Sequence, residues 1–466
     1  MVFVDRREEM KRLDRAAERR EGALVVLWGR RRLGKTRLLT EWCRKYRGTY
    51  WVAEESAPAI QRRYLSVELA RVFPGFSDVD YPDWNALFER LAREAGRIEW
   101  PGPLVIDEFP YLIPGSPELP SVLQRWMDRE RREGSVVLAL SGSSQRMMQG
   151  SILNAGAPLY GRAVEVLRIN PLRAGYISDA AGLRDARAML DYYTCWGGVP
   201  RYWELSHSFG ADLKTAVDDL VLSPLGVLHD EVGRLLRQEM PSAVPLRPVL
   251  DAIGLGAHKS SEIAGRLQTT ATSIARPLRQ LQELGYVRRD VPFGESEKRS
   301  KKSVYELADP FLRLWFQVVA PHRGALRSAS GAGRRKLLES AWSGLRARAW
   351  EEVCREAVPL LERVEGDWGV SGRYWRGNAG EWDVVSTSRD GSALLLGECK
   401  AAGRRIDQKA ADKIVRGLMS KEPPALPGAE HMRKVYVIFV PAVEPSLTLP
   451  PGVHVVDGGQ VFAALS

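Results

Sequence analysis

The stretch Ala23–Arg37, ALVVLWGRRRLGKTR, joins a run of apolar residues to a loop bounded by two glycines. Residues Gly29 to Thr36 fit the pattern G-x-x-x-x-G-K-[ST], whose backbone N–H groups wrap around phosphate oxygens where no Cβ would fit. The apolar run Ala23–Trp28 predicts a buried strand. The spacing from Lys35 to about residue 47 predicts a helix whose positive end faces the same phosphates. This order of elements predicts a nucleotide-binding α/β domain.

Strands and helices continue to alternate after this loop. Apolar runs predict strands at 49–53, 103–109 and 136–141, and helical spacing occurs at about 59–73, 84–96 and 119–133. Strands that alternate with helices of about 10–15 residues imply a mostly parallel sheet covered on both faces. The expected fold class is therefore α/β, with a P-loop NTPase sheet in the first part of the chain.

Two acidic residues, Asp107 and Glu108, lie at the end of the strand 103–109. A carboxylate buried there without a partner would cost several kcal/mol, so it needs a cation or hydrogen-bond donors. We expect Asp107 to face Mg²⁺ through water and Glu108 to activate the attacking water. Lys35 should reach the β- and γ-phosphates, and the Thr36 hydroxyl should ligate Mg²⁺. The next strand end offers a choice of three hydroxyls for the γ-phosphate or that water: Ser141, Ser143 or Ser144.

Length and composition limit the number of domains and the class of protein. The chain has 466 residues, more than one core usually organises, so we expect two to four domains. Its 44% apolar and 27% charged residues argue against disorder and collagen-like structure. No apolar run reaches the length of a membrane helix, and the opening MVFVDRREEM is charged, so we expect a cytoplasmic protein. The four separated cysteines predict reduced thiols, and the net charge of +10 mildly favours nucleic acid.

Six blocks of the sequence resemble a known family. The strings GRRRLGKTRLL, DEFPYL, SGSS, PLYGR at 158–162, GGVP at 197–200 and DPFLRLWF are similar to archaeal-type ATPases, within the AAA+/STAND-like P-loop NTPases. The resemblance covers nearly the whole chain, because members often carry a winged helix and a C-terminal nuclease-like (DUF234-like) domain. One departure is Asp5, where family members tend to have glycine.

The resemblance also nominates Arg162 as a charge-sensing arginine, with a structural salt bridge after the fourth strand as the alternative. Thr36 and Asp107 are expected to bind Mg²⁺. The full set expected to bind ATP and Mg²⁺ is Gly29, Arg30, Arg31, Arg32, Leu33, Gly34, Lys35, Thr36, Arg37, Asp107, Ser143 and Arg162.

Residues 245–310 predict three short helices followed by a basic two-stranded wing, the order of a winged helix-turn-helix. The third helix would enter a major groove and the wing would lie on phosphate, provided that the helix begins near Ser273 so that Pro277 is tolerated. A rigid spacer without DNA contact is the alternative. The basic residues concerned are Lys259, Arg266, Arg276, Arg279, Arg288, Arg289, Lys298, Arg299, Lys301 and Lys302.

Near the C-terminus, Glu381-Trp-Asp383 and Glu398-Cys-Lys400 flank the turn signal Arg389-Asp390-Gly391. A two-residue turn at Asp390-Gly391 places Asp383 opposite Glu398 and Glu381 opposite Lys400, with all four side chains on one face. Opposed carboxylates repel unless a cation lies between them. We therefore predict Mg²⁺ or Mn²⁺ on Asp383, Glu398 and a carbonyl near Cys399. Lys400 would orient a metal-bound water or stabilise charge on the phosphate.

This arrangement resembles the PD-(D/E)XK nuclease superfamily, with Asp383, Glu398 and Lys400 in the roles of D, E and K. The superfamily often adds a glutamate from the preceding helix to the metal site, and Glu351 matches it better than Glu352. The alternative is an exposed sheet face with paired surface charges.

The expected organisation has five segments. These are a P-loop ATPase core at 1–170, a helical lid at 171–244, a winged helix-turn-helix at 245–322, a Gly/Ser-rich linker at 323–335 and a restriction-endonuclease-like α/β domain at 336–466.

The leading hypothesis is an enzyme that hydrolyses ATP and couples nucleotide state to DNA binding and metal-dependent phosphodiester cleavage. The alternative is a nucleotide-switched regulator with a catalytically silent nuclease-like domain. DNA is the expected partner, no membrane is expected, and a homo-oligomer is left open. The catalytic residues would be Lys35, Glu108, Asp383, Glu398 and Lys400, and the metal ligands Thr36, Asp107, Glu351, Asp383 and Glu398.

Overall fold

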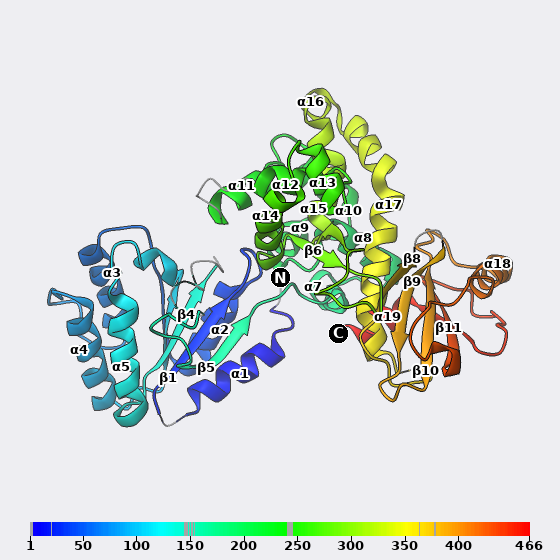
Figure 1. Cartoon of the computed structure of the whole chain (residues 1–466). Coiled ribbons are helices and arrows are strands. Elements are labelled where there is room, and N and C mark those ends of the chain that lie inside the picture. The colour runs from blue at the N-terminus through cyan, green and yellow to red at the C-terminus, as the bar shows by residue number, and fades with distance from the viewer. Residues whose placement is uncertain are drawn as a thin grey trace. The chain divides into compact units, whose positions relative to one another are not determined.

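The computed structural model describes residues 3–19, 21–143, 148, 150, 152, 154–239, 246–362, 364–376 and 379–466. The chain forms two compact units, Arg6–Asn170 and Met1–Asp5 with Pro171–Ser466. It therefore crosses from one unit to the other twice, after Asp5 and after Asn170. Figure 1 shows the elements of both units.

The Arg6–Asn170 unit is built on a five-stranded sheet of order β2-β3-β4-β1-β5, in which every neighbouring pair is parallel. This confirms the parallel α/β core predicted from the alternation of strands and helices. The strands are β1 (Ala23–Trp28), β2 (Thr49–Val52), β3 (Pro103–Asp107), β4 (Val137–Gly142) and β5 (Ala163–Arg168).

Helices cover both faces of this sheet. Leu24 and Leu138 point into a cluster shared with Leu65, Leu87 and Leu123, which come from three helices on one face. The helices of the unit are α1 (Arg7–Ala17), α2 (Lys35–Tyr46), α3 (Pro58–Ala70), α4 (Trp84–Arg97) and α5 (Leu119–Glu133). Because both faces are covered, the strands are nearly continuous apolar runs.

The second unit begins with short helices and continues with a helical trio and a hairpin. The hairpin is an antiparallel pair, β6 (Val287–Asp290) with β7 (Val304–Leu307). The helices before it are α7 (Ile177–Ala181), α8 (Ala186–Trp196), α9 (Pro200–His207), α10 (Leu213–Val217), α11 (Glu231–Glu239), α12 (Leu246–Gly254), α13 (Ser260–Arg266) and α14 (Ala271–Glu283).

The linker expected at 323–335 is wrong, because this stretch is helical. It lies in α16 (Ala320–Ser328) and in the first turns of α17 (Gly331–Ala357), which follow α15 (Pro310–Leu314). Ser330 caps α17 by accepting the Gly333 N–H, and Arg334 forms a two-pronged ion pair with Asp218, with N–O distances of 2.7 and 3.1 Å. The Gly/Ser composition suggested flexibility, but a capping serine and a partner 116 residues away order the segment.

Helix α17 connects the helical part of the second unit to its C-terminal sheet. It contacts α8 and α15 along one part of its length and β9 and β10 along another (Figure 1). Near its C-terminal end Trp350 donates a 3.0 Å hydrogen bond to the Phe439 carbonyl of the sheet. The segments after residue 170 that were predicted as separate domains are therefore packed into one compact unit.

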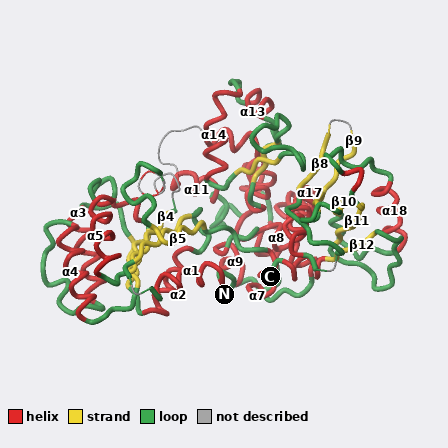
Figure 2. The backbone as a smooth tube through the Cα atoms, turned by 60° about the horizontal axis from the view of Figure 1, so that its bottom comes forward, coloured by secondary structure: helices red, strands yellow, loops and turns green. Residues whose placement is uncertain are grey.

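The C-terminal sheet is mixed, with the order β12-β11-β10-β9-β8 (Figure 2). Strands β8 to β10 are antiparallel, and β10 to β12 are parallel. The elements are β8 (Gly372–Arg376), β9 (Ala379–Thr387), β10 (Ala393–Cys399), α18 (Gln408–Met419), β11 (Arg433–Val440), β12 (Val453–Asp457) and α19 (Gly458–Ala464). Helix α18 packs on one face through Ala411, Val415 and Leu418.

None of the helices within the described ranges has the length and apolarity needed to traverse a bilayer.

Candidate functional site

The glycine loop after β1 ends at Gly34, where α2 begins. Gly34 has a φ of 82°, in the left-handed region that favours glycine. A Cβ on Gly29 would come within 2.6 Å of the Ile169 carbonyl oxygen, so a larger residue would not fit. The ammonium of Lys35 is buried inside the loop and donates to the carbonyls of Gly29 (2.7 Å) and Arg30 (3.3 Å). The local geometry is that of a phosphate-binding loop.

The carboxylate of Asp107 lies beside this loop because parallel strands end at one edge of the sheet. Its Oδ2 accepts hydrogen bonds from the Thr36 hydroxyl (3.0 Å) and from the Tyr50 phenol (2.6 Å). Burial and the nearby Asp107 charge raise the pKa of Tyr50, so its phenol remains a donor. Sequence reasoning did not find Tyr50; its place on β2, two residues before the partner of Asp107 in the strand pairing, was the available signal.

Glu108 is held by Ser143, which follows β4. Ser143 donates both its backbone N–H, at 3.2 Å, and its hydroxyl to the Glu108 carboxylate, and its Oγ lies 3.5 Å from the Lys35 ammonium. Glu108 has a φ of 52°, an uncommon backbone conformation for a non-glycine residue that often marks functional sites. The structure thus joins Lys35, Ser143 and Glu108 in one contact chain. Of the other two hydroxyls considered, Ser141 is buried on β4, and Ser144 lies outside the described residues.

Arg162 lies at the opposite edge of the sheet from the glycine loop. It immediately precedes β5, and the pairing Leu24–Ala163 places it beside the start of β1, whereas the loop follows the end of β1. Its guanidinium forms a two-pronged ion pair with Asp128, with N–O distances of 2.9 and 3.1 Å. The structure therefore favours the structural salt bridge over a charge-sensing contact with this chain's own nucleotide.

Arg6 links the glycine loop to the end of its unit. This residue is 4% exposed, and its guanidinium donates to the carbonyls of Leu33 (3.0 Å) and Asn170 (2.7 Å). Asp5 and Arg6 have φ values of 60° and 66°, both in the left-handed region. This backbone shape explains physically why glycine would suit position 5, where this chain has aspartate.

The C-terminal hairpin has the register predicted from sequence. The structure pairs Leu394 with Thr387 and Gly397 with Val384, the last pair of the ladder before Glu398 and Asp383. The turn itself differs from the prediction: Ser388 bonds to Ala393 at 2.9 Å, so the loop has four residues instead of two. Both loops give the same register, because adding one residue to each side preserves the pairing.

The side chain of Asp383 replaces a backbone acceptor at the end of this ladder. Its Oδ2 accepts the Cys399 N–H at 2.8 Å. Burial, together with the charges of Glu398 and Glu351, raises the pKa of Asp383 to about 6. Glu351 pairs with Arg355 at 3.3 Å, whereas Glu352 is committed to Arg288 and Arg313. This supports the preference for Glu351 over Glu352 at the site.

Two ammonium groups hold Glu398. Lys400 lies 2.7 Å from Oε1, and Lys421, just beyond the end of α18, lies 2.5 Å from Oε2. Lys400 is therefore bound to Glu398, although the sequence predicted Glu381 opposite it. Burial alone would raise the pKa of Glu398, but the two lysines outweigh it and hold the pKa below its ordinary value. Lys421 carried no sequence signal, because it lies 23 residues from its partner.

The donor chemistry fits a hard divalent cation, since Asp383, Glu398 and Glu351 supply carboxylate oxygens. Within the described part of the chain, however, no three His, Cys, Asp or Glu side chains are arranged to hold a metal. The oxygens of Glu398 already bear ammonium groups. Metal ligation there would require a lysine to move.

Two basic residues of the wing at β6–β7 form contacts within the protein. Arg288 pairs with Glu306 (2.9 Å) and Glu352 (2.8 Å), and Arg289 donates to the backbone carbonyls of Glu297 and Ser300. The Phe293 N–H bonds to the Arg373 carbonyl of β8 at 2.7 Å. These residues are therefore unavailable for the phosphate contacts expected of the wing.

Helix α14 begins at Ala271, close to the start expected near Ser273, and Pro277 lies inside it. Thr270 caps the helix by accepting the Ser273 N–H at 3.2 Å. Arg276 and Arg279 remain exposed on this helix.

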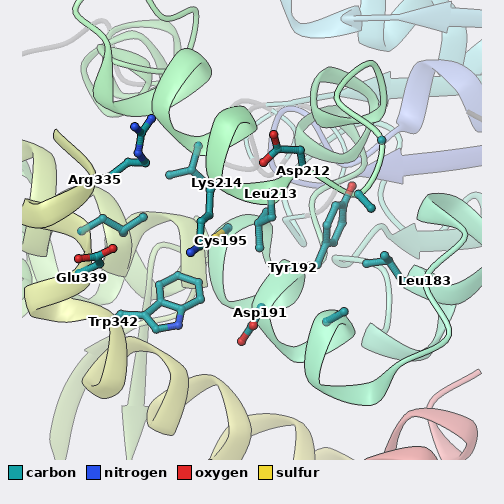
Figure 3. A pocket seen from close by; sticks show the side chains of 15 residues that line it. Leu183, Asp191, Tyr192, Cys195, Asp212, Leu213, Lys214, Arg335, Glu339 and Trp342 are labelled. Atoms are coloured by element: carbon teal, nitrogen blue, oxygen red, sulfur yellow. The ribbon is translucent and has the colours of Figure 1, made fainter. Parts of the chain in front are cut away.

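A cavity of about 490 Å³ lies among α8, α10 and α17 (Figure 3). Its lining includes Asp191 and Glu339 as well as Lys214 and Arg335, so its charged groups have both signs. Burial raises the pKa of Asp191 against the opposing effect of its ion pair with Arg346. The cavity contains no residue of the glycine loop or of the carboxylate cluster, and its lining selects no ligand charge.

The parallel sheet, the glycine loop and the acidic strand end define the Arg6–Asn170 unit as a Walker-type P-loop ATPase domain. Residues 3–180 match the family model of an ATPase domain found predominantly in Archaea. This part of the chain is similar to that family, as its motifs predicted. Residues 315–414 match a family of archaeal and bacterial proteins of unknown function, the DUF234 family, which confirms the second resemblance without assigning an activity.

Two known proteins are similar over much of the chain. An uncharacterized protein of Methanocaldococcus jannaschii is 27% identical over 450 residues, which cover 95% of this chain and 96% of that protein. A Walker-type ATPase of Pyrococcus abyssi, known from a solved structure, is 18% identical in sequence and superimposes with a TM-score of 0.54. The match covers 68% of this chain and 96% of that protein's chain. At this identity the structural likeness concerns the fold alone.

Proposed function

We propose that the Arg6–Asn170 unit hydrolyses ATP with Mg²⁺, using the residues gathered at the carboxyl edge of its sheet. The observation that carries this proposal is the chain of contacts from Lys35 through Ser143 to Glu108, beside the pair formed by Thr36 and Asp107. A hydroxyl and a carboxylate oxygen are donors that Mg²⁺ prefers. When bound, Mg²⁺ would neutralise charge on the β- and γ-phosphates.

Each side chain has a separate part in this proposal. Lys35 exchanges its carbonyl partners for phosphate oxygens, because an ammonium group bonds more strongly to an anion. Glu108 is oriented by Ser143 and accepts a proton from the attacking water. Tyr50 keeps Asp107 turned toward Thr36.

Lys35→Ala and Glu108→Gln test this assignment. Lys35→Ala should abolish binding of a fluorescent ATP analogue. Glu108→Gln should retain binding but lose roughly 100-fold or more in hydrolysis, the usual effect of losing a general base. Glu118→Gln, a change at an exposed carboxylate, is the control and should leave both unchanged. Undiminished hydrolysis in Glu108→Gln would reject Glu108 as the base.

We further propose that the C-terminal sheet carries a divalent-metal site that cleaves phosphodiester bonds. The supporting observation is the half-buried Asp383, whose pKa is raised beside Glu398 and Glu351, with Lys400 adjacent. Asp383 and Glu398 would hold the cation, Glu351 would complete its carboxylate set, and Lys400 would stabilise charge on the phosphate. The regulatory alternative, with a silent site, is favoured by the lack of a three-ligand arrangement among the described residues.

We propose DNA as the partner of this unit, bound through cations that have no carboxylate partner within the described ranges. On α18 the exposed Lys409, Lys413 and Arg416 share one face at i, i+4 and i+7 spacing. Lys400 precedes this helix in the sequence and Lys421 follows it. Both lysines contact Glu398, so the helix lies beside the carboxylate cluster. Arg276 and Arg279 on α14 would add contacts as the third helix of a winged helix-turn-helix.

Plasmid nicking with Mn²⁺, with and without ATP, separates the enzyme from the regulator. Asp383→Ala and Lys400→Ala should abolish nicking, whereas Glu381→Gln, at the exposed neighbouring carboxylate, should not. Nicking that persists in both site variants would reject cleavage at this site. Absence of nicking by the wild type, with DNA binding retained, would favour the regulatory alternative. Binding should weaken in the Lys409→Gln, Lys413→Gln, Arg416→Gln triple variant and show a reduced salt dependence.

A further inference from the structure

We propose that Lys421 competes with the divalent cation for Glu398, so that it acts as a built-in positive charge that restrains metal binding. This inference rests on the metal site proposed above. It concerns a residue that lies outside the D, E and K positions and comes from a different element, the segment after α18.

Three contacts fix the Lys421 side chain at the site. Its ammonium lies 2.5 Å from Oε2 of Glu398 and donates to the Glu381 carbonyl at 2.8 Å. It also lies 5.3 Å from the centre of the Trp382 ring. The backbone beside it is anchored as well, because Trp382 donates a 3.0 Å hydrogen bond to the Glu422 carbonyl. A lysine side chain usually loses considerable entropy when fixed, so this arrangement needs several contacts at once.

The charges of the cluster balance without a metal. The carboxylates of Asp383 and Glu398 are offset by the ammonium groups of Lys400 and Lys421, while Glu351 pairs with Arg355. A divalent cation added to this arrangement would leave two excess positive charges in a partly buried site, where their repulsion is weakly screened. Metal binding and the Lys421 contact therefore oppose each other.

We assign Lys421 as the lysine that yields, because Lys400 already has a part in the proposed metal site. Lys400 follows β10 directly and bonds Oε1, whereas Lys421 occupies Oε2 from outside the strand pair. Its release breaks only contacts of its own side chain, so the ladder of β9 and β10 stays intact. A bound phosphodiester would supply a new anion for the freed ammonium. Nucleic acid and metal should consequently bind with positive coupling, each favouring the displaced state of Lys421.

Direct Mn²⁺ binding, followed by the loss of the free-ion paramagnetic resonance signal, tests the inference without reference to cleavage. Lys421→Met should bind Mn²⁺ about three- to tenfold more tightly than the wild type, as expected for loss of a partly buried competing charge. Adding an uncleavable phosphorothioate oligonucleotide should tighten Mn²⁺ binding by the wild type but much less by Lys421→Met. Lys434→Met, a change at an exposed lysine on β11 of the same sheet, is the control and should bind Mn²⁺ as the wild type does.

The outcomes separate this inference from the metal site on which it rests. Unchanged or weaker Mn²⁺ binding by Lys421→Met, while Asp383→Ala abolishes binding, overturns the competition but keeps the site. Mn²⁺ binding that is absent from the wild type and from Lys421→Met overturns both. Lys421→Gln, which retains a hydrogen-bond donor without the charge, should reproduce the tighter binding and guards against a folding defect in the methionine variant.

Discussion

The phenol of Tyr50 donates a 2.6 Å hydrogen bond to Oδ2 of Asp107, the same oxygen that accepts the Thr36 hydroxyl. These residues come from neighbouring strands and from the helix after the glycine loop. The bond aims the carboxylate toward the position proposed for Mg²⁺. It gives the candidate ATPase site a positioning residue that lies outside its sequence motifs.

Tyr50→Phe should therefore raise the Mg²⁺ concentration needed for half-maximal ATP hydrolysis by about three- to tenfold, the value of one hydrogen bond. Nucleotide binding without Mg²⁺ should change little, because Lys35 and the loop remain intact. Titrating hydrolysis with Mg²⁺ checks this. Tyr46→Phe removes a comparable bond from Tyr46 to Glu18 on the same unit and should leave the Mg²⁺ dependence unchanged. Equal behaviour of the two variants would show that Tyr50 does not position Asp107.

Arg162→Met should lower stability by less than about 1 kcal/mol, as expected for a partly exposed ion pair. The guanidinium bonds Asp128 at the sheet edge opposite the glycine loop. ATP hydrolysis at low protein concentration should be unchanged, and Asp128→Asn should reproduce the small thermal shift. A loss of hydrolysis greater than tenfold in Arg162→Met, with Asp128→Asn fully active, would return Arg162 to a charge-sensing role.

Asp5→Gly should raise the thermal midpoint slightly, with a gain of at most about 1 kcal/mol, because the φ of 60° is strained for a residue with a Cβ. Asp5→Val should lower it, since a β-branched side chain is disfavoured most in this region. The control is Glu8→Gly on α1, where helical backbone makes glycine unfavourable by about 1 kcal/mol. Scanning calorimetry measures all three changes. A lower midpoint for both Asp5 variants would contradict the strain.

Asp383→Asn should stabilise the metal-free protein above pH 6. The folded-state pKa of Asp383 is raised to about 6, above the ordinary value of about 4 in the unfolded chain. The folded state thus binds the proton more tightly, and stability falls as the pH rises from about 4 to about 6. Asp383→Asn lacks the carboxylate charge, so its stability should not fall over this pH range. Thermal midpoints from pH 3.5 to 8 in the presence of a chelator measure it.

Asp390→Asn on the same hairpin serves as a control of opposite sign. Hydrogen bonds from Ser388 and Ser392 lower the pKa of Asp390 to about 2. Its contribution to stability is present above its unfolded pKa of about 4 and is lost as the pH falls toward 2. This variant should therefore be less stable than the wild type above pH 4. Parallel pH profiles for the two variants would contradict the opposite environments of the two carboxylates.

Local patterns in the sequence determined the ATPase fold and the hairpin register. The glycine loop, the apolar strand before it and the helix after it lie within about 25 residues, so short-range chain geometry specifies them. The alternation of strands and helices predicted the parallel sheet. The register that ends in the Gly397–Val384 pair followed from the period of two in a strand and from a turn centred on Asp390 and Gly391.

Only the tertiary structure decided which partner each charged side chain has. Tyr50 and Lys421 reach their carboxylates across 57 and 23 residues, and Arg334 orders the expected linker by binding Asp218 across 116 residues. Arg288 and Arg289 could bind DNA or protein equally well as free side chains. Folding brings carboxylates and carbonyls to them, and these contacts remove them from the nucleic-acid surface. The sequence determined where strands and loops form, because those depend on neighbouring residues, while ion pairs depend on distances in space.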